Sequence, residues 1–445
     1  QAEDGIRDSS TSRGLGDVYK RQYMNVPVVP SLPIIGHSIP FQRDALNFTA
    51  GMQKKYGDVF QILLLNQDFI VLLNPEITRE IFLDKDDNYS SKEGWAVTLG
   101  PTFENGLMLR DFDDHKYHRT LLQDSFRHEA IHNYLSIIQP IIDDWIDQIK
   151  LKSSFNLYES VKQLMFDISL SLFFLNVKKD ESQYLNKLFM DSIASATSAV
   201  RWPLPFTQLK KGLKSRAYLL DYFQSKSEMI NEESKKTLFA ELVNTNKGDV
   251  GLSNYEIAEH MIFLLLAAHD TTTITLTNSI YNLSRNEDFL SDIRQEAFEV
   301  DPLDISSLKN GNFAESIFQE AIRFYPPVPF SIRRVMRDTK IQDYPVSRGT
   351  YLTISPLLLH HDERYWDNPS NFDPYRFIDP SYTNKAYFPF AGGAHTCIGK
   401  FFASYMFKNV IYKYVQNIEQ PIIEDRLNIR PTPIPHPIED VRVSI

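Results

Sequence analysis

The sequence predicts an α+β fold that is mainly helical, and three observations on the 445-residue chain support this. Helical periodicity dominates from Glu76 to Tyr325. Strand-like runs are short and flank that region, in segments 59–73 and 331–355 and again after Leu427. Because helices and strands are segregated rather than alternating, we expect a large helical region beside small β-sheets.

The chain opens with two segments that differ from this pattern. Residues 1–22 have no periodicity and no apolar face, and they resemble sequencing-adapter read-through. We therefore predict that 1–22 are a non-native leader and that 23–445 form the functional domain, which leaves open a missing native N-terminus and any anchor it carried. The proline-rich segment 26–40 predicts an extended lead-in to a helix over 48–56, and runs 59–65 and 69–73 predict a hairpin.

Composition excludes several classes of function. The formal net charge of −10 gives no basic footprint, so we expect no nucleic-acid partner. A single cysteine cannot form an intramolecular disulfide, which favours a reducing compartment. The longest apolar run, 261–268, is too short to span a bilayer. We expect a cytoplasmic protein, with membrane association left open if a native N-terminal anchor is missing.

The first candidate site in chain order is the segment HKYHR. His115 and Arg119 are four residues apart and share one face of a helix. On spacing alone, a solvated basic face is the commoner explanation, and an anion-binding site is the alternative.

A long helix is predicted over 253–284. Ser253 and Glu256 form a capping-box start, and no glycine or proline follows for about thirty residues, or roughly 45 Å. Asp270 and Thr271 follow the most apolar turn of this helix. Two interpretations stay open: a polar site at the buried centre, or core threonines whose hydroxyls bond to the preceding turn.

A buried ion pair is predicted in the segment FAESIFQEAIRFYPP. Glu320 falls inside the apolar helical stripe that Phe313 and Ile317 define, and Arg323 follows three residues later. An ordinary surface ion pair is commoner in general but fits this apolar face poorly. Arg376, in NFDPYRF, is a second candidate partner for Glu320.

The single cysteine, Cys397, lies in FPFAGGAHTCIG just before a predicted helix. Unpaired N–H groups at a helix N-terminus favour thiolate, the form that binds metals. A buried structural cysteine is the alternative. Gly392, Gly393 and Gly399 favour the ligand interpretation, because glycine allows a backbone to approach a flat ligand closely.

This loop resembles the haem-binding loop of the cytochromes P-450, the haem-thiolate monooxygenases. Phe390, Gly393, Cys397 and Gly399 match its pattern, and AAHDTT, EAIR and FDPYRF resemble further motifs of the family in the same order. The resemblance covers 26–445. It implies the P-450 fold, with a long central helix, and haem b (iron protoporphyrin IX) as the cofactor.

Roles then follow from the resemblance, residue by residue. It implies that Cys397 is the axial thiolate and that Asp270 and Thr271 deliver protons to dioxygen. It implies a structural triad of Glu320 with its two arginines. The expected contacts to the haem propionates are His115, Arg119, Arg334 and His395. Arg333 leaves this assignment ambiguous by one residue, His395 stands where arginine is commoner, and Ala268 replaces the usual glycine.

The resemblance also implies a substrate pocket with a mostly apolar or aromatic lining, which suggests a lipophilic substrate such as a terpenoid, steroid or fatty acid. The residues expected to line it are Trp95, Leu99, Phe103, Leu107, Phe263, Ala267, Val328, Phe330 and Ile434. The segment RWPLPF, 201–206, leaves open a peripheral membrane contact, although an exposed loop is the simpler interpretation.

The implied function is an external monooxygenase that uses O2. Because no flavin- or NADPH-binding segment fits in this length, we expect electrons from a ferredoxin with its reductase or from a flavoprotein reductase. A haem-thiolate peroxygenase, isomerase or lyase is one alternative, and a non-catalytic haem-binding sensor is another. Neither alternative needs the Asp270–Thr271 pair.

Overall fold

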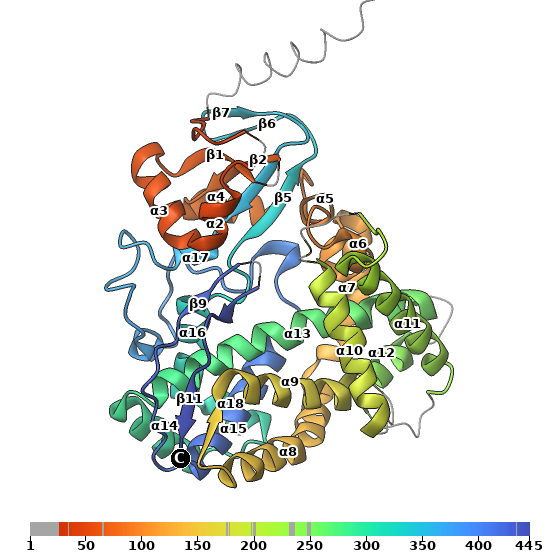
Figure 1. Ribbon diagram of the computed structural model, residues 1–445, viewed down its shortest axis with the longest axis vertical. Coiled ribbons are helices and arrows are strands. Elements are labelled where there is room, and N and C mark those ends of the chain that lie inside the picture. Colours follow the sequence, from red (N-terminus) through yellow and green to blue (C-terminus); the bar gives the residue numbers. More distant parts are fainter. Residues whose placement is uncertain are drawn as a thin grey trace, which may run out of the picture.

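The computed structural model describes residues 26–33, 35–64, 66–174, 177, 179–196, 198, 202–230, 236–246, 251–432 and 434–445. Figure 1 shows a sheet-rich part at the top and a helical part below it, with the long helix α13 crossing the helical part. The mainly helical α+β class is therefore confirmed. None of the helices in the described ranges combines the length and apolarity needed to cross a membrane.

The sheet-rich part contains a five-stranded sheet in the order β1-β2-β8-β5-β3, whose pairs are antiparallel except β2 with β8. The remaining strands form the two-stranded sheets β6-β7, β9-β10 and β4-β11. The strands are β1 Val59–Leu64, β2 Gln67–Leu72, β3 Tyr89–Ser90, β4 Ser154–Asn156, β5 Ser331–Val335, β6 Thr339–Ile341, β7 Tyr344–Val346, β8 Tyr351–Ile354, β9 Ile429–Arg430, β10 His436–Pro437 and β11 Arg442–Ser444.

The helices of the first half are α2 Ser38–Arg43, α3 Ala45–Tyr56, α4 Pro75–Leu83, α5 Ser91–Trp95, α6 Gly100–Phe103, α7 Phe112–Leu122, α8 His128–Lys150, α9 Leu157–Phe173, α10 Lys179–Ala196 and α11 Gln208–Ser227. Those of the second half are α12 Leu238–Thr245, α13 Asn254–Leu283, α14 Glu287–Glu299, α15 Ile305–Asn310, α16 Asn312–Phe324, α17 Pro356–Leu359 and α18 Lys400–Asn417. Short 3-10 turns are η1 Leu107–Leu109, η2 Gln123–Phe126, η3 Pro374–Phe377 and η4 Gly393–His395.

Several sequence predictions are confirmed locally. The hairpin forms between β1 and β2, and Ser253 caps α13 in a capping box with Glu256. Two boundaries differ. Helix α3 begins at Ala45 because the Asp44 side chain accepts the N–H of Asn47, and part of the predicted extended lead-in forms the short helix α2.

Both faces of the five-stranded sheet are buried. One face packs Ile70 and Leu352 against Ile81 of α4, and the other packs Phe60 and Val71 against residues of α3. The helical part has its own core, which includes the first half of α13 and most of α18. The cysteine loop, 388–399, leads into α18 and contacts α4, so the candidate site lies where the sheet-rich and helical parts meet.

Candidate active site

The cysteine loop folds back on itself and against α4. The Cys397 N–H donates to the Phe390 carbonyl (3.1 Å), and Gly393 has a φ of +61°. A Cβ at Gly393 would collide with the Phe82 carbonyl oxygen, and one at Gly392 would press on the Phe82 side chain at 3.1 Å. The close approach that requires glycine here is therefore to α4. A ligand contact at Gly393 stays a prediction.

The Cys397 thiol is accessible, but its surroundings disfavour the thiolate form. Its side chain is exposed, yet burial among surrounding protein atoms raises its pKa, outweighing the Gly399 N–H and the charges of Arg119 and Lys400. The sequence analysis predicted that N–H groups before the following helix favour thiolate. The Gly399 N–H does lower the pKa, but desolvation outweighs it. An accessible sulfur whose surroundings disfavour the thiolate is suited to a bound group that stabilises that form.

Four basic side chains gather beside this thiol. Arg119 of α7 donates to the Thr396 carbonyl (2.7 Å), and the rings of His115 and His395 lie 3.9 Å apart. Arg333 of β5 is buried and lies close enough to affect both histidines. Burial and these positive charges lower the pKa of His115 to about 4 and that of His395 to about 2. Both rings are therefore neutral near pH 7.

The register of β5 decides between the two neighbouring arginines. Along the strand Ser331, Arg333 and Val335 are buried, while Ile332 and Arg334 face the other way. Arg334 pairs with Glu93 (3.0 Å), donates to the Gly349 carbonyl and covers the Tyr351 ring. Arg334 therefore lies outside the basic cluster, and Arg333 occupies the place the sequence analysis gave to Arg334. In a strand every second side chain lies on the same face, so Arg333 shares a face with the apolar Val335. This two-residue period was the sequence signal that could have identified Arg333.

This basic cluster fits a cofactor that carries two carboxylates. Within the described part of the chain, neither Arg119 nor Arg333 forms an ion pair with a carboxylate. Burial lowers the pKa of Arg333 to about 10, so at pH 7 it is still charged. Two guanidinium ions beside a thiol match the two propionates and the axial ligand that haem b requires.

A second polar cluster joins α16 to the segment before η3. Arg323 donates to both oxygens of Glu320 (2.6 and 2.8 Å) and to the carbonyls of His360, Pro369 and Asn371. The Glu320 carboxylate also accepts from Arg376 (3.4 Å) and from the Asp373 N–H (2.8 Å). Burial raises the pKa of Glu320 in spite of these partners. The three residues of the predicted triad are thus in contact.

The centre of α13 carries the predicted acid and alcohol side by side. The Thr271 hydroxyl donates to the Ala267 carbonyl (2.7 Å), and Thr273, Thr275 and Thr277 make the same bond to the preceding turn. This is the back-bonding that the alternative interpretation of the helix described. Asp270 differs, because its carboxylate pairs with His269 (2.9 Å) and is only partly buried.

The predicted substrate contacts separate into two groups. Phe103, Leu107 and Phe263 belong to the helical core, and Trp95, Leu99, Ala267 and Ile434 pack against it. Phe263 fills the space beside Gly106, where a Cβ would collide with its ring. Phe330 instead packs on Phe41 of α2, and Val328 is exposed. Contact of any of these residues with a substrate stays a prediction.

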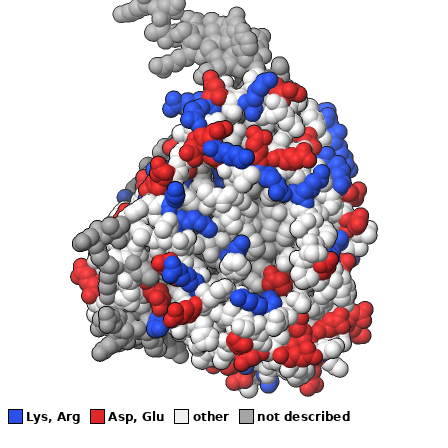
Figure 2. All heavy atoms as spheres, turned by 180° about the vertical axis from the view of Figure 1, so that it is seen from behind, with Lys and Arg blue, Asp and Glu red and all other residues white. Residues whose placement is uncertain are grey.

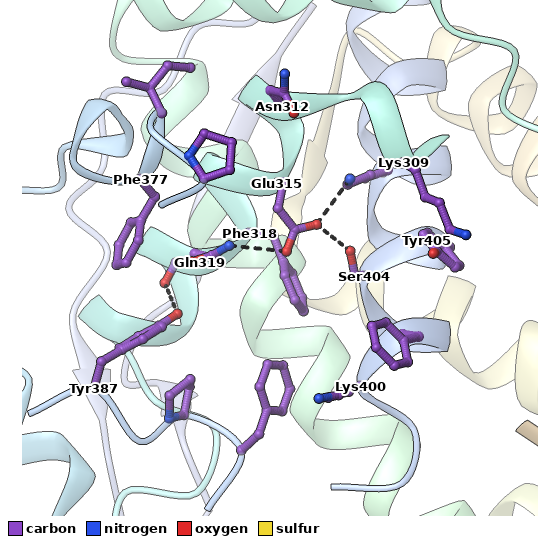
Figure 3. Close-up of a pocket in the computed structure, with 16 residues that line it drawn as sticks. Lys309, Asn312, Glu315, Phe318, Gln319, Phe377, Tyr387, Lys400, Ser404 and Tyr405 are labelled. Carbon is purple, nitrogen blue, oxygen red and sulfur yellow. Dashed lines mark hydrogen bonds and ion pairs between the residues drawn. The ribbon is translucent and has the colours of Figure 1, made fainter. Parts of the chain in front are cut away.

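Sequence reasoning missed a pocket of about 460 Å³ between α15, α16, η3 and α18. Figure 3 shows Glu315 at its centre, accepting from Ser404 and Gln319, with Tyr387 donating to the Gln319 carbonyl. Lys408 also pairs with Glu315 (3.0 Å). Phe390 and Lys400 line the pocket, so it adjoins the cysteine loop.

Comparison with known proteins identifies a family for the chain. The family model described as Cytochrome P450 matches residues 26–432. The cytochrome P450 136 of Mycobacterium tuberculosis H37Rv is 30% identical over 430 residues, covering 92% of this chain and 87% of that protein. Abscisic acid 8'-hydroxylase 2 of Arabidopsis thaliana is 24% identical over 449 residues, covering 96% and 91%. The solved structure of retinoic acid-bound cyanobacterial CYP120A1 covers 95% of this chain and 99% of its own, with a TM-score of 0.82 and 23% identity.

Proposed function

The chain belongs to the cytochrome P450 family, and on that premise we propose that it inserts one atom of O2 into a lipophilic small molecule with electrons from a separate redox partner. It is an oxidoreductase, a P450 monooxygenase, and its cofactor is haem b. The observation that carries the proposal is the pair of guanidinium ions in the basic cluster at the cysteine loop. Arg119 acts on Cys397 and Arg333 on His395, and neither arginine forms an ion pair with a carboxylate among the described residues.

We assign the cofactor contacts accordingly. Cys397 would provide the axial thiolate, and Arg119 and Arg333 would bind the propionates, with Arg333 in place of Arg334. His115 and His395 are neutral near pH 7, so they would donate or accept hydrogen bonds rather than pair as cations. When bound, haem b supplies the reduction and cleavage of dioxygen.

The role of the chain's own residues is to hold and move protons. Thr271 Oγ1 donates to the Ala267 carbonyl, so its lone pairs can still accept a hydrogen bond from water or a bound oxygen species. Asp270 is next to it in the chain and is partly exposed, which allows its carboxylate to exchange protons with water. An acid and an alcohol together form a relay that a peroxide-using enzyme would not need.

We propose a terpenoid, steroid or fatty-acid-like substrate. The predicted pocket residues are apolar or aromatic, and two relatives carry names that refer to abscisic acid and retinoic acid, both molecules with large hydrocarbon skeletons. For the electron donor we propose a ferredoxin with its reductase or a flavoprotein reductase. Figure 2 shows Lys and Arg mixed with Asp and Glu on one face, so a nucleic-acid partner is not proposed.

A peripheral membrane contact is a secondary proposal, and it rests on segment 202–206; Arg201 lies outside the described residues. Trp202, Leu204 and Phe206 are exposed, and Phe206 has a φ of +66°. Exposed apolar side chains in one loop favour an interfacial contact. Co-sedimentation with phosphatidylcholine vesicles should decrease in Trp202→Ser and Phe206→Ser. Equal co-sedimentation of wild type and variants would favour the simple exposed loop.

The experiment that tests the proposed function compares wild type, Thr271→Ala and Thr271→Ser with surrogate redox partners. Removing the hydroxyl should leave substrate binding intact but lower the product formed per NADPH consumed, with more peroxide released, whereas Thr271→Ser should be close to wild type. Reactions fed with peroxide should be much less affected. An unchanged ratio in Thr271→Ala would favour the alternative, a haem-thiolate peroxygenase, isomerase or lyase.

A further inference from the structure

The imidazole of His269 contacts both Asp270, the proposed proton-delivering acid, and helix α10. His269 of α13 is only 1% exposed, and its Nδ1 lies 2.9 Å from Asp270 Oδ1. The edge of Phe189, from α10, meets the imidazole with ring centroids 5.5 Å apart at 84°. A carboxylate oxygen accepts hydrogen bonds, and we assign the hydrogen of this contact to His269 Nδ1 on that ground.

His269 has contacts at both its backbone and its side chain. The Thr273 hydroxyl donates to the His269 carbonyl (2.8 Å), which adds a second bond to its backbone oxygen. The imidazole itself has two contacts, the T-shaped one with Phe189 and the hydrogen bond with Asp270. A buried ring nitrogen needs a hydrogen-bond partner, and for His269 Nδ1 that partner is the carboxylate next to Thr271.

Helix α9 packs against α13. Burial and the charge of Asp270 both raise the pKa of Tyr158, so this phenol lies within electrostatic reach of the carboxylate. Lys162 lies over the Tyr158 ring at 5.4 Å. The carboxylate therefore has an imidazole partner on its own helix and lies within electrostatic reach of a phenol on α9, and 13% of its side chain is exposed.

We propose that His269 is a positioning residue for proton delivery: its Nδ1–H holds the Asp270 carboxylate in the one orientation from which it serves Thr271. This inference rests on the proposed function, because it assigns a role to the neighbour of the acid and alcohol. A hydrogen bond to a charged group is among the stronger ones in proteins, so it selects one side-chain conformation effectively.

Two variants separate positioning from packing. His269→Leu keeps an apolar side chain against Phe189 but removes the donor, whereas the amide N–H of His269→Asn can take the place of Nδ1–H. Loss of a hydrogen bond to a charged group predicts that His269→Leu forms roughly threefold to tenfold less product per NADPH and releases more peroxide. His269→Asn should stay within about twofold of wild type. Substrate binding and the peroxide-fed reaction should be unchanged in both.

A matched control uses a second buried imidazole of the same helix. His260 pairs with His118 (2.9 Å) and forms no hydrogen bond or ion pair with Asp270 among the described residues. His260→Leu therefore reports the general cost of removing a buried histidine from α13. It should lower thermal stability without lowering product per NADPH.

A spectroscopic measurement tests the contact without turnover. In protein labelled with nitrogen-15 histidine, the His269 signal is identified by its loss in His269→Asn. Wild type should show a protonated Nδ1, and Asp270→Leu should shift this signal towards the other tautomer. A wild-type ring with an unprotonated Nδ1 would overturn the inference, even if His269→Leu failed to fold.

The outcomes also separate this inference from the proposed function. If Thr271→Ala uncouples NADPH use from product but His269→Leu does not, the positioning role is wrong and the monooxygenase proposal stands. If His269→Leu and His260→Leu lose coupling equally, or if His269→Asn fails to rescue, His269 acts through packing alone. If neither Thr271→Ala nor His269→Leu changes the ratio, the proposed function itself fails.

Discussion

Two buried arginines, Arg323 and Arg333, lie ten positions apart in the sequence and differ in their hydrogen-bond partners. Arg323 is 0% exposed, and its guanidinium donates to both oxygens of Glu320 and to three carbonyls. Arg333 is 3% exposed, and one of its nitrogens donates to Ser331 Oγ and the Ile332 carbonyl, with no carboxylate partner among the described residues.

The difference teaches which buried charges serve the fold and which serve a ligand. A buried charge is costly unless an opposite charge compensates it. Glu320 gives this compensation to Arg323 from within the chain. Neither Arg333 nor Arg119 forms an ion pair with a carboxylate in the described part of the chain. Arg333 has only the more distant charges of Asp111 and Asp84, so closer compensation would come from the cofactor. Removing one member of each group should therefore have different consequences.

The largest expected effect comes from breaking the completed cluster. Glu320→Ala or Arg323→Ala leaves an uncompensated buried charge, which should cost about 3 to 5 kcal/mol and reduce the yield of folded holoprotein. Urea unfolding measures the loss of stability, and haem content measures the yield of folded holoprotein. Arg376→Ala is the control: its contact with Glu320 is longer, 3.4 Å, so its effect should be clearly smaller. Wild-type stability in both main variants would contradict the compensation argument.

The next largest effect is expected from Cys397, the thiol beside the basic cluster. Cys397→Ser should abolish the red-shifted absorption band of the reduced carbon monoxide complex, because a neutral hydroxyl cannot donate electron density as a thiolate does. Absorption spectra of the reduced, carbon monoxide-treated variant provide the measurement. A persisting band would show that another residue is the axial ligand.

The third prediction concerns haem binding by Arg333. Its neighbour Arg334 is the control, because it is also an arginine but lies on the opposite face of β5. Arg333→Leu should weaken haem binding by roughly 10- to 100-fold, the value of a charge-assisted hydrogen bond, while the haem-free protein keeps or gains stability. Arg334→Leu removes a partly exposed pair with Glu93 and should change haem binding little. Haem titration and urea unfolding of the haem-free proteins check both. Equal weakening in the two variants would contradict the β5 assignment.

The smallest expected effect is a pH dependence of folding stability that arises from His361, close to Arg323. Burial and the charge of Arg323 lower the pKa of the adjacent His361 to about 4. Because the unfolded chain takes up this proton near pH 6.5 and the folded chain does not, stability should fall as pH drops from about 6.5 to 4, by on the order of 2 kcal/mol. His361→Asn should reduce this slope in urea unfolding. An unchanged slope would mean that His361 titrates normally.

Local signals in the sequence were sufficient for much of this structure. The capping box at Ser253, the hairpin and the burial of Glu320 depend on residues close together in the chain. The choice between Arg333 and Arg334 depended on strand register, which a one-residue shift reverses. The direction of the Cys397 pKa could not be predicted, because it depends on protein atoms brought close by the tertiary fold.

The contact between Gly393 and Phe82 has a consequence for the order in which the molecule assembles. These two residues are separated by most of the chain, so their contact forms only after a very long loop has closed. The cysteine loop cannot reach its final shape until α4 and the loop have both been synthesised. Haem capture is therefore expected to be a late event, and the rate of cofactor incorporation during refolding would report when the two distant parts of the chain have met.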